Sequence, residues 1–154
     1  SYTMATIAVT LSFALLLFMS CEKLEKDVKL VSAKFGEASH NTGDNCMSCH
    51  TNAGDVEGWF VIAGTVYDKT GSTTDANGDV KIFTGQNGTG KQMDNIEVDA
   101  LGNFYTTHFL SFEDGLYPAV FLTSGDTKFM TNKVYTGNCN SCHGVGNTPK
   151  IGQE

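Results

Sequence analysis

Positive charge is scarce in this chain of 154 residues. Lysine and arginine together number 10 against 17 aspartates and glutamates, which gives a formal net charge of −7. Binding to nucleic acid requires a basic patch, so this composition argues against a nucleic-acid partner. Proline is also scarce, at 2 residues, whereas glycine reaches 17. This balance fits short strands joined by many turns.

Cysteine and histidine are few, and most of them fall in two short motifs. Cys46-Met47-Ser48-Cys49-His50 recurs near the other end of the chain as Cys139-Asn140-Ser141-Cys142-His143. The two motifs take four of the five cysteines and two of the four histidines. Only Cys21 is left over, so no pair of cysteines remains for a disulfide.

The Cys-x-x-Cys-His pattern is the attachment site of a c-type haem. Its two thiols add to the two vinyl groups of one porphyrin, and the adjacent histidine ligates the iron as the proximal ligand. A zinc ribbon fits less well, because its two cysteine pairs are usually about 15–20 residues apart. In this chain the separation runs from Cys49 to Cys139. The residues predicted to hold two covalent haems are therefore the thiols of Cys46, Cys49, Cys139 and Cys142 and the axial ligands His50 and His143.

The sixth ligand of each haem iron has to come from elsewhere in the chain. The two remaining histidines are His40 and His108, and imidazole is a common axial ligand. We predict that His40, in the polar loop before the first motif, ligates the first haem. For the second haem His108 and Met130 are both open, and the count of histidines slightly favours His108. A methionine ligand would raise the potential of that haem.

An uncharged apolar run occupies residues 4–20 and ends in Phe18-Met19-Ser20-Cys21. The run resembles a secretory signal that ends in the lipobox of bacterial lipoproteins, in which the cysteine is lipidated. No lysine or arginine precedes the run, so an uncleaved membrane anchor stays an alternative for residues 1–21. Either interpretation predicts a membrane-attached protein in the periplasm or at the cell surface.

Between the motifs the pattern changes to period two. Gly, Asp and Asn turns separate six β-branched or aromatic segments, at 60–67, 80–83, 93–98, 103–108, 116–123 and 128–135. These segments predict a mainly β protein with a single antiparallel β-sandwich. An even number of antiparallel strands returns the chain to the end where it entered, so the haem segments should lie near one another. The predicted units are a signal or anchor at 1–21, a linker at 22–38, a first haem segment at 39–58, the sandwich at 59–135 and a second haem segment at 136–154.

The strand sequences A-G-T-V-Y-D, V-K-I-F, D-A-L-G-N-F-Y-T and G-L-Y-P-A-V-F resemble the carboxypeptidase regulatory-like (transthyretin-like) β-sandwich. With a haem motif on each flank, residues 39–146 resemble a family of bacterial dihaem c-type cytochromes that carry this sandwich. The resemblance implies an electron carrier of the periplasm or cell surface. It also implies a His-Asn-Thr-Gly loop before the first haem, here within residues 40–46, which supports His40 as a ligand.

No general base, nucleophile or phosphate-binding loop is evident in the sequence. The predicted function is therefore electron transfer without substrate turnover, with redox proteins or neighbouring cytochrome subunits as partners. Two alternatives stay open. One iron could lack a sixth ligand, as in a small dihaem reductase or peroxidase, or copies of the chain could polymerise into an extracellular filament of stacked haems.

Overall fold

The computed structural model describes residues 30–51, 56 and 58–154. Within this part of the chain the fold is mainly β, with seven strands and three single-turn 3-10 helices. The strands are β1 (Ile62–Thr65), β2 (Asp79–Phe83), β3 (Gln92–Glu97), β4 (Asn103–Thr106), β5 (Tyr117–Phe121), β6 (Thr127–Phe129) and β7 (Gly137–Asn138). The 3-10 turns are η1 (Cys46–Ser48), η2 (Gln86–Gly88) and η3 (Cys139–Ser141).

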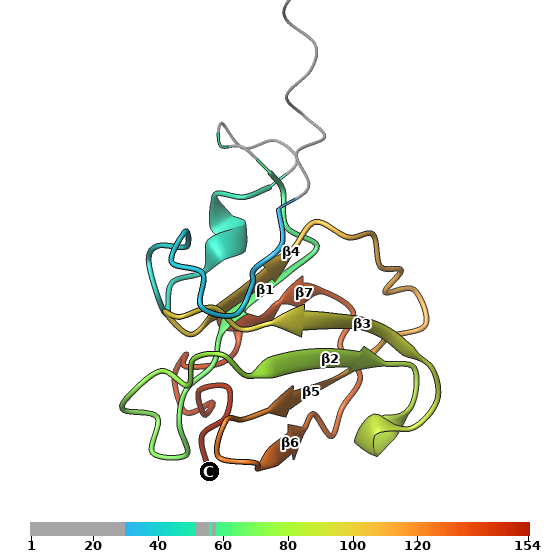
Figure 1. Ribbon diagram of the computed structural model, residues 1–154. Coiled ribbons are helices and arrows are strands. Elements are labelled where there is room, and N and C mark those ends of the chain that lie inside the picture. Colours follow the sequence, from blue (N-terminus) through green and yellow to red (C-terminus); the bar gives the residue numbers. More distant parts are fainter. Residues whose placement is uncertain (1–29, 52–55, 57) are drawn as a thin grey trace, which may run out of the picture.

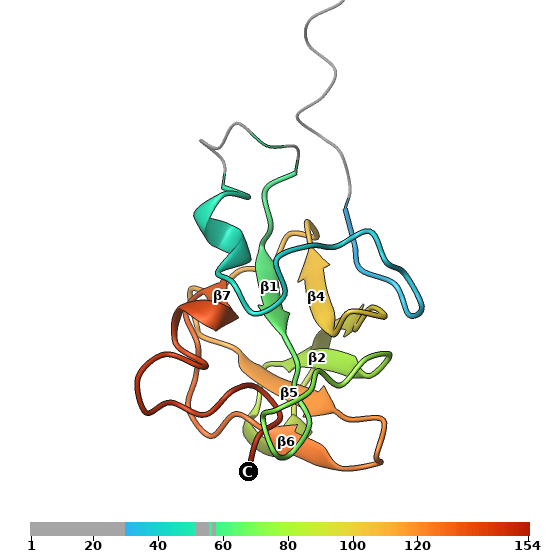
Figure 2. The same cartoon turned by 90° about the vertical axis from the view of Figure 1, so that its left-hand side faces the viewer.

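The strands form two sheets that pack against each other (Figures 1 and 2). One sheet is antiparallel with the order β3-β2-β5-β6, and the other has the order β4-β1-β7. Apolar side chains from both sheets meet in one buried cluster. It includes Ile62 and Phe104 from the sheet β4-β1-β7 and Ile82, Ile96 and Val120 from the sheet β3-β2-β5-β6. Two sheets around one core are the arrangement of a β-sandwich.

Burial follows the alternation of side chains most clearly in β2. In β2, Val80 and Ile82 are buried, whereas Asp79 and Lys81 are only partly covered. In β1, by contrast, all four residues are buried. Thr65 and its alternate neighbours point away from the face that carries Ile62, and there the loop before the first haem motif covers β1. Figure 1 shows this loop and η1 over the sheet that contains β1 and β4.

All six predicted strands are confirmed, although most are shorter than predicted. The predicted strand at 128–135 is interrupted, because β6 ends at Phe129 and Val134 makes only an isolated bridge to Leu116. The chain between these two points carries Met130, whose backbone N–H still donates to the Pro118 carbonyl at 2.9 Å. The interruption frees the Met130 side chain from the regular alternation of the strand.

The seventh strand, β7, lies outside the predicted set and corrects the prediction of a wholly antiparallel sandwich. It pairs in parallel with β1, with Gly137 opposite Ile62 and Asn138 opposite Ala63. A strand of two residues carries no hydrophobic period, so its sequence gives no signal. The pairing places the second haem motif, which follows at once, beside β1. The expected proximity of the two haem segments is confirmed: the Asn140 amide donates to the Asp44 carbonyl at 2.8 Å.

Part of the predicted linker at 22–38 belongs to the sandwich. Val31 bridges to Thr106, and the Ser32 hydroxyl donates to the Glu97 carbonyl at 2.6 Å. The Lys34 ammonium is 2.8 Å from the Asp79 carboxylate. From residue 30 onward the chain is therefore held against the sheets and does not form a free tether.

Residues 1–29 lie outside the described part of the chain, and with them the apolar run and Cys21. In the residues that are described, none of the helices has the length and apolar character needed to span a bilayer.

The close pairing of β7 with β1 gives a first prediction. A Cβ atom at Gly137 would clash with the Val61 carbonyl oxygen and would lie 2.7 Å from the Ile62 Cα. Because both contacts are to backbone, we expect Gly137→Ala to lower the free energy of unfolding by about 1–3 kcal/mol in urea titrations. The exposed neighbour Thr136→Ala should change it by less than about 0.5 kcal/mol. Equal stabilities of the two variants would contradict the tight pairing.

Candidate haem-binding site

The two Cys-x-x-Cys-His motifs fold into nearly the same turn. η1 and η3 each begin at the first cysteine, and the second cysteine follows with φ −108° and ψ −44° at Cys49 and φ −114° and ψ −48° at Cys142. The histidine N–H then donates to the carbonyl of the first cysteine, at 3.0 Å for His50 and 3.1 Å for His143. One turn of chain thus gathers two thiols and one imidazole, as attachment to a single porphyrin requires.

Each motif begins with the same local hydrogen bond. The Ser48 hydroxyl donates to the Asn45 carbonyl at 2.7 Å, and the Ser141 hydroxyl donates to the Asn138 carbonyl at 2.7 Å. In both motifs the first cysteine is partly covered and the second is exposed. The sequence repeat is therefore a structural repeat as well.

Both motif histidines are oriented through the same ring nitrogen. The Nδ1 atom of His50 lies 2.9 Å from the Gly58 carbonyl oxygen, and that of His143 lies 2.8 Å from the Pro149 carbonyl oxygen. A carbonyl oxygen can only accept, so Nδ1 is the donor in each of these contacts. A hydrogen bond from one ring nitrogen to a backbone carbonyl is the usual support for a histidine whose other nitrogen binds a metal.

His40 lies beside the first motif, as the sequence predicts. The ring centroids of His40 and His50 are 5.9 Å apart, with an interplanar angle of 38°. Two imidazoles that share one metal, at about 2 Å from each nitrogen, have ring centroids about 6 Å apart. The spacing is compatible with both imidazoles holding one metal ion, were a haem bound here. The His50 ring also stacks on Phe60, with ring centroids 4.2 Å apart.

The loop that carries His40 needs residues that tolerate a left-handed backbone. Asn41 has φ 51° and Gly43 has φ 89°. A Cβ atom at Gly43 would lie 2.6 Å from the Tyr67 hydroxyl oxygen. The His-Asn-Thr-Gly sequence is thus explained by local geometry, since asparagine and glycine are the residues that most readily adopt positive φ.

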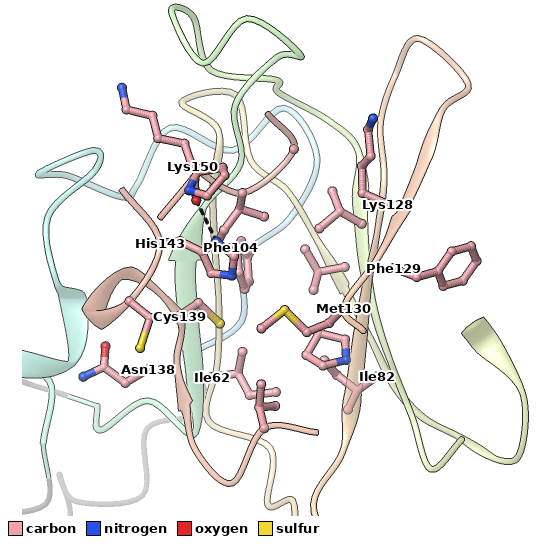
Figure 3. A pocket seen from close by; sticks show the side chains of 18 of the residues that line it. Ile62, Ile82, Phe104, Lys128, Phe129, Met130, Asn138, Cys139, His143 and Lys150 are labelled. Carbon is pink, nitrogen blue, oxygen red and sulfur yellow. Dashed lines mark hydrogen bonds between the residues drawn. The ribbon is translucent and has the colours of Figure 1, made fainter. Parts of the chain in front are cut away.

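The second motif opens onto a large apolar cavity between the two sheets (Figure 3). The cavity has a volume of about 850 Å³, within the roughly 300–1,000 Å³ that small-molecule and cofactor sites occupy. Its walls include Ile62, Ile82 and Phe104 from the sandwich core. Cys139, Cys142 and His143 from the second motif also line it, so one cavity holds two thiols and one imidazole.

Met130 and His108, the two candidates for the sixth ligand of the second haem, lie in different parts of the fold. Met130 lines the cavity, and Figure 3 shows its thioether pointing into the space that Cys139 and His143 face from the other side. His108 is not among the cavity residues; its side chain is 50% exposed, with Nδ1 3.3 Å from a carboxylate oxygen of Asp94 on β3. β3 and β6 are opposite edges of their sheet. The fold therefore brings Met130, and not His108, to the second motif.

Burial raises the pKa of the first cysteine of each motif, Cys46 and Cys139. Loss of contact with solvent, with a smaller contribution from the neighbouring Cys46 and Cys142 thiols, raises the pKa of Cys139 to about 12. Burial also raises the pKa of Cys46, to which the Asp44 carboxylate adds, while a backbone hydrogen bond opposes the shift. Both thiols are therefore neutral near pH 7 in the haem-free chain. Among the described residues, no three His, Cys, Asp or Glu side chains are grouped to hold a metal ion directly.

Three polar residues at the site lie outside the predicted set. Thr65, Asn103 and Asn140 are buried and join the two haem segments through side-chain hydrogen bonds. Asn140 occupies a variable position of its motif, and the other two occupy strand positions, so the sequence pattern gives them no special role. The signal is tertiary, because it depends on which strands and loops the fold brings together.

No protein-family model, curated protein or solved structure matches this chain. The functional assignment therefore depends on the two motifs and on the geometry around them. The resemblance to dihaem cytochromes with a transthyretin-like sandwich stays a prediction.

The difference in burial within each motif predicts an order of thiol modification. In haem-free protein at pH 8, a thiol with a pKa of about 12 is ionised to only about one part in ten thousand. Iodoacetamide should therefore label the exposed Cys49 and Cys142 well before Cys139, as measured by peptide mass spectrometry over time. Labelling in urea provides the control, because unfolding should equalise the rates. Equal rates in the native protein would contradict the raised pKa of Cys139.

Proposed function

We propose that this protein is a dihaem c-type cytochrome that carries electrons outside the cytoplasm. The observation that supports this most strongly is the duplicated turn, in which two thiols accompany a histidine whose Nδ1 is held by a backbone carbonyl. Such a turn can bind a porphyrin covalently and present an imidazole nitrogen to its iron. Its repetition beside β1 provides two such centres in one small protein.

The proposed roles of the residues follow from their chemistry. In each motif the two S–H groups add across the two vinyl groups, with the sulfur forming a thioether and the proton passing to the vinyl carbon. His50 and His143 serve as proximal ligands, and His40 is the sixth ligand at the first site. The haem iron, when bound, supplies the redox chemistry by alternating between its ferric and ferrous states. The protein fixes its position, its ligands and its access to water.

We assign the sixth ligand of the second haem to Met130. The support is its place in the cavity, opposite His143, together with the location of His108 beside β3. A thioether ligand would favour the ferrous state because it is a softer and weaker donor than imidazole, and an apolar surrounding would favour it because that state carries less charge. The two sites should thus differ in potential, with the bis-histidine site lower. Electrons would pass from the first haem to the second without an uphill step.

The rim of the cavity suits the charged edge of a haem. Lys128, Lys133 and Lys150 all line the cavity, although the chain as a whole has a net charge of −7. Figure 3 shows Lys128 and Lys150 at one end of it, with their ammonium groups directed outward. Haem carries two propionates on one edge, and lysine ammonium groups are suitable partners for carboxylates. The Lys128 ammonium already pairs with Glu154 at 3.1 Å and the Lys150 ammonium donates to the Gly71 carbonyl at 3.0 Å, so propionates would compete with these contacts. The apolar lining favours an orientation with the apolar edge of the haem inward.

Membrane attachment completes the proposal. The apolar run at 4–20 and Cys21 supply either a lipid anchor or an uncleaved helix. Either one would hold the two haems at a membrane surface in the periplasm or outside the cell, where redox partner proteins can reach them.

Covalent haem content tests the proposal directly. Protein made with intact cytochrome maturation machinery should show two haems per chain in a pyridine haemochrome assay after denaturation. The variants Cys46→Ala/Cys49→Ala and Cys139→Ala/Cys142→Ala should each retain one haem, because each removes the thiols of one turn. A chain without covalent haem, or with zinc bound to the thiols, would refute the proposal.

Absorption spectra and potentials test the ligand of the second haem. The oxidised protein should show a sulfur-to-iron band in the near infrared, and Met130→His should abolish it. This change should lower one potential by on the order of 0.1 V, within the range of about 0.8 V that axial ligands span. The matched variant His108→Leu should keep both the band and the potentials. Loss of a haem ligand in His108→Leu would reverse the assignment.

A further inference from the structure

A buried threonine on β1 joins the two haem segments. Thr65 is 0% exposed, and its hydroxyl donates to the side-chain oxygen of Asn103 at 2.7 Å. The same hydroxyl accepts from the Gly43 N–H at 3.0 Å and from the Asn140 amide at 3.1 Å. Gly43 belongs to the first haem segment and Asn140 to the second. One side chain is therefore shared by segments that are about a hundred residues apart in sequence.

On one side the network holds the loop that carries His40. The Asn103 amide donates to the Ser39 hydroxyl at 2.9 Å and to the Thr42 hydroxyl at 3.0 Å. Together with the bond from Gly43 to Thr65, these contacts fix the chain both before and after His40. The imidazole is thus placed by a loop whose two ends are attached to β4 and β1.

On the other side the network continues the pairing of β1 with the second motif. After β7 ends at Asn138, the Thr65 N–H donates to the side-chain oxygen of Asn140 at 3.1 Å. The Asn140 amide also donates to the Asp44 carbonyl at 2.8 Å. The asparagine side chain thus takes the place of a backbone partner on this edge of β1, and it links η3 directly to the loop before η1.

The sandwich itself does not need a polar group at these positions. Buried polar side chains are costly unless they are satisfied, and a valine at position 65 would keep the shape of the strand. The three buried side chains are well satisfied, with donors matched to acceptors on both haem segments. A satisfied buried network specifies one arrangement of the segments that it joins.

We propose that the buried network of Thr65, Asn103 and Asn140 sets the position of His40 and the spacing between the two haems. The inference depends on the proposed function, because it concerns the ligand of the first haem and the separation of two haems. Thr65 acts as a positioning residue at the centre, Asn103 extends the network to the His40 loop, and Asn140 extends it to the second motif.

Electron paramagnetic resonance of the ferric dihaem protein tests the inference. In Thr65→Val, we expect the high-spin fraction of the first haem to rise roughly tenfold, equivalent to about 1.4 kcal/mol in the ligation equilibrium. The magnetic coupling between the haems should change as well. Thr65→Ser keeps the hydroxyl and should restore the wild-type spectrum. Asn140→Ala should alter the coupling with little gain in high-spin signal, because it breaks only the link to the second motif.

Thr106→Val is the matched control. Thr106 is also 0% exposed on the same sheet, and within residues 30–51, 56 and 58–154 its hydroxyl accepts just a local bond, from the His108 N–H. Its spectrum should match that of the wild type. If Thr65→Val and Asn140→Ala both give the spectrum of this control, the inference is overturned while the dihaem assignment stands. If the wild-type protein lacks two low-spin haems, the proposed function itself fails. Should Thr65→Val not fold, Asn140→Ala still decides the spacing.

Discussion

The edge of β1 that faces away from β4 is the constraint on which the rest of the site depends. Gly137 and Asn138 pair with it through their backbone, Asn140 continues through its side chain, and Ile151 bridges to Val66. The C-terminal segment is therefore fastened to β1 before and after the second motif. The first motif reaches the same strand from its outer face, through Gly43 and Thr65. A short strand in this way serves as a common base for both turns.

The inner and outer faces of that strand offer different surroundings. On the inner face the second motif looks into an apolar cavity of about 850 Å³ between the sheets. Protein interiors seldom keep voids larger than a water molecule, since their walls lose packing contacts. On the outer face His40 and His50 lie in a loop-rich and more open region. A group bound inside would be drier than one bound outside, and burial is among the factors that tune the potential of a haem.

Binding of a ligand in this cavity would be coupled to the stability of the fold. The walls of the cavity include the core residues Ile62, Ile82 and Phe104, so a ligand that fills it also completes the packing of both sheets. Any ligand that binds only the folded chain stabilises it. Covalent attachment, as proposed for the haem, would make this contribution permanent. The polar network around Thr65 is complete without a ligand, and it keeps the two turns in register.

The sequence by itself determined the six longer strands, the two thiol-histidine turns and the candidate His40, because each depends on local periodicity or spacing. It left His108 and Met130 open, since strand patterns do not say which edge of a sheet a residue occupies. Only the tertiary structure decided that Met130 lines the cavity beside the second motif and that His108 lies near Asp94. The pairing of β7 with β1 and the Thr65 network are also visible only in the tertiary structure. Their residues depend on partners between 22 and 96 positions away in the sequence, and no local pattern records such pairings.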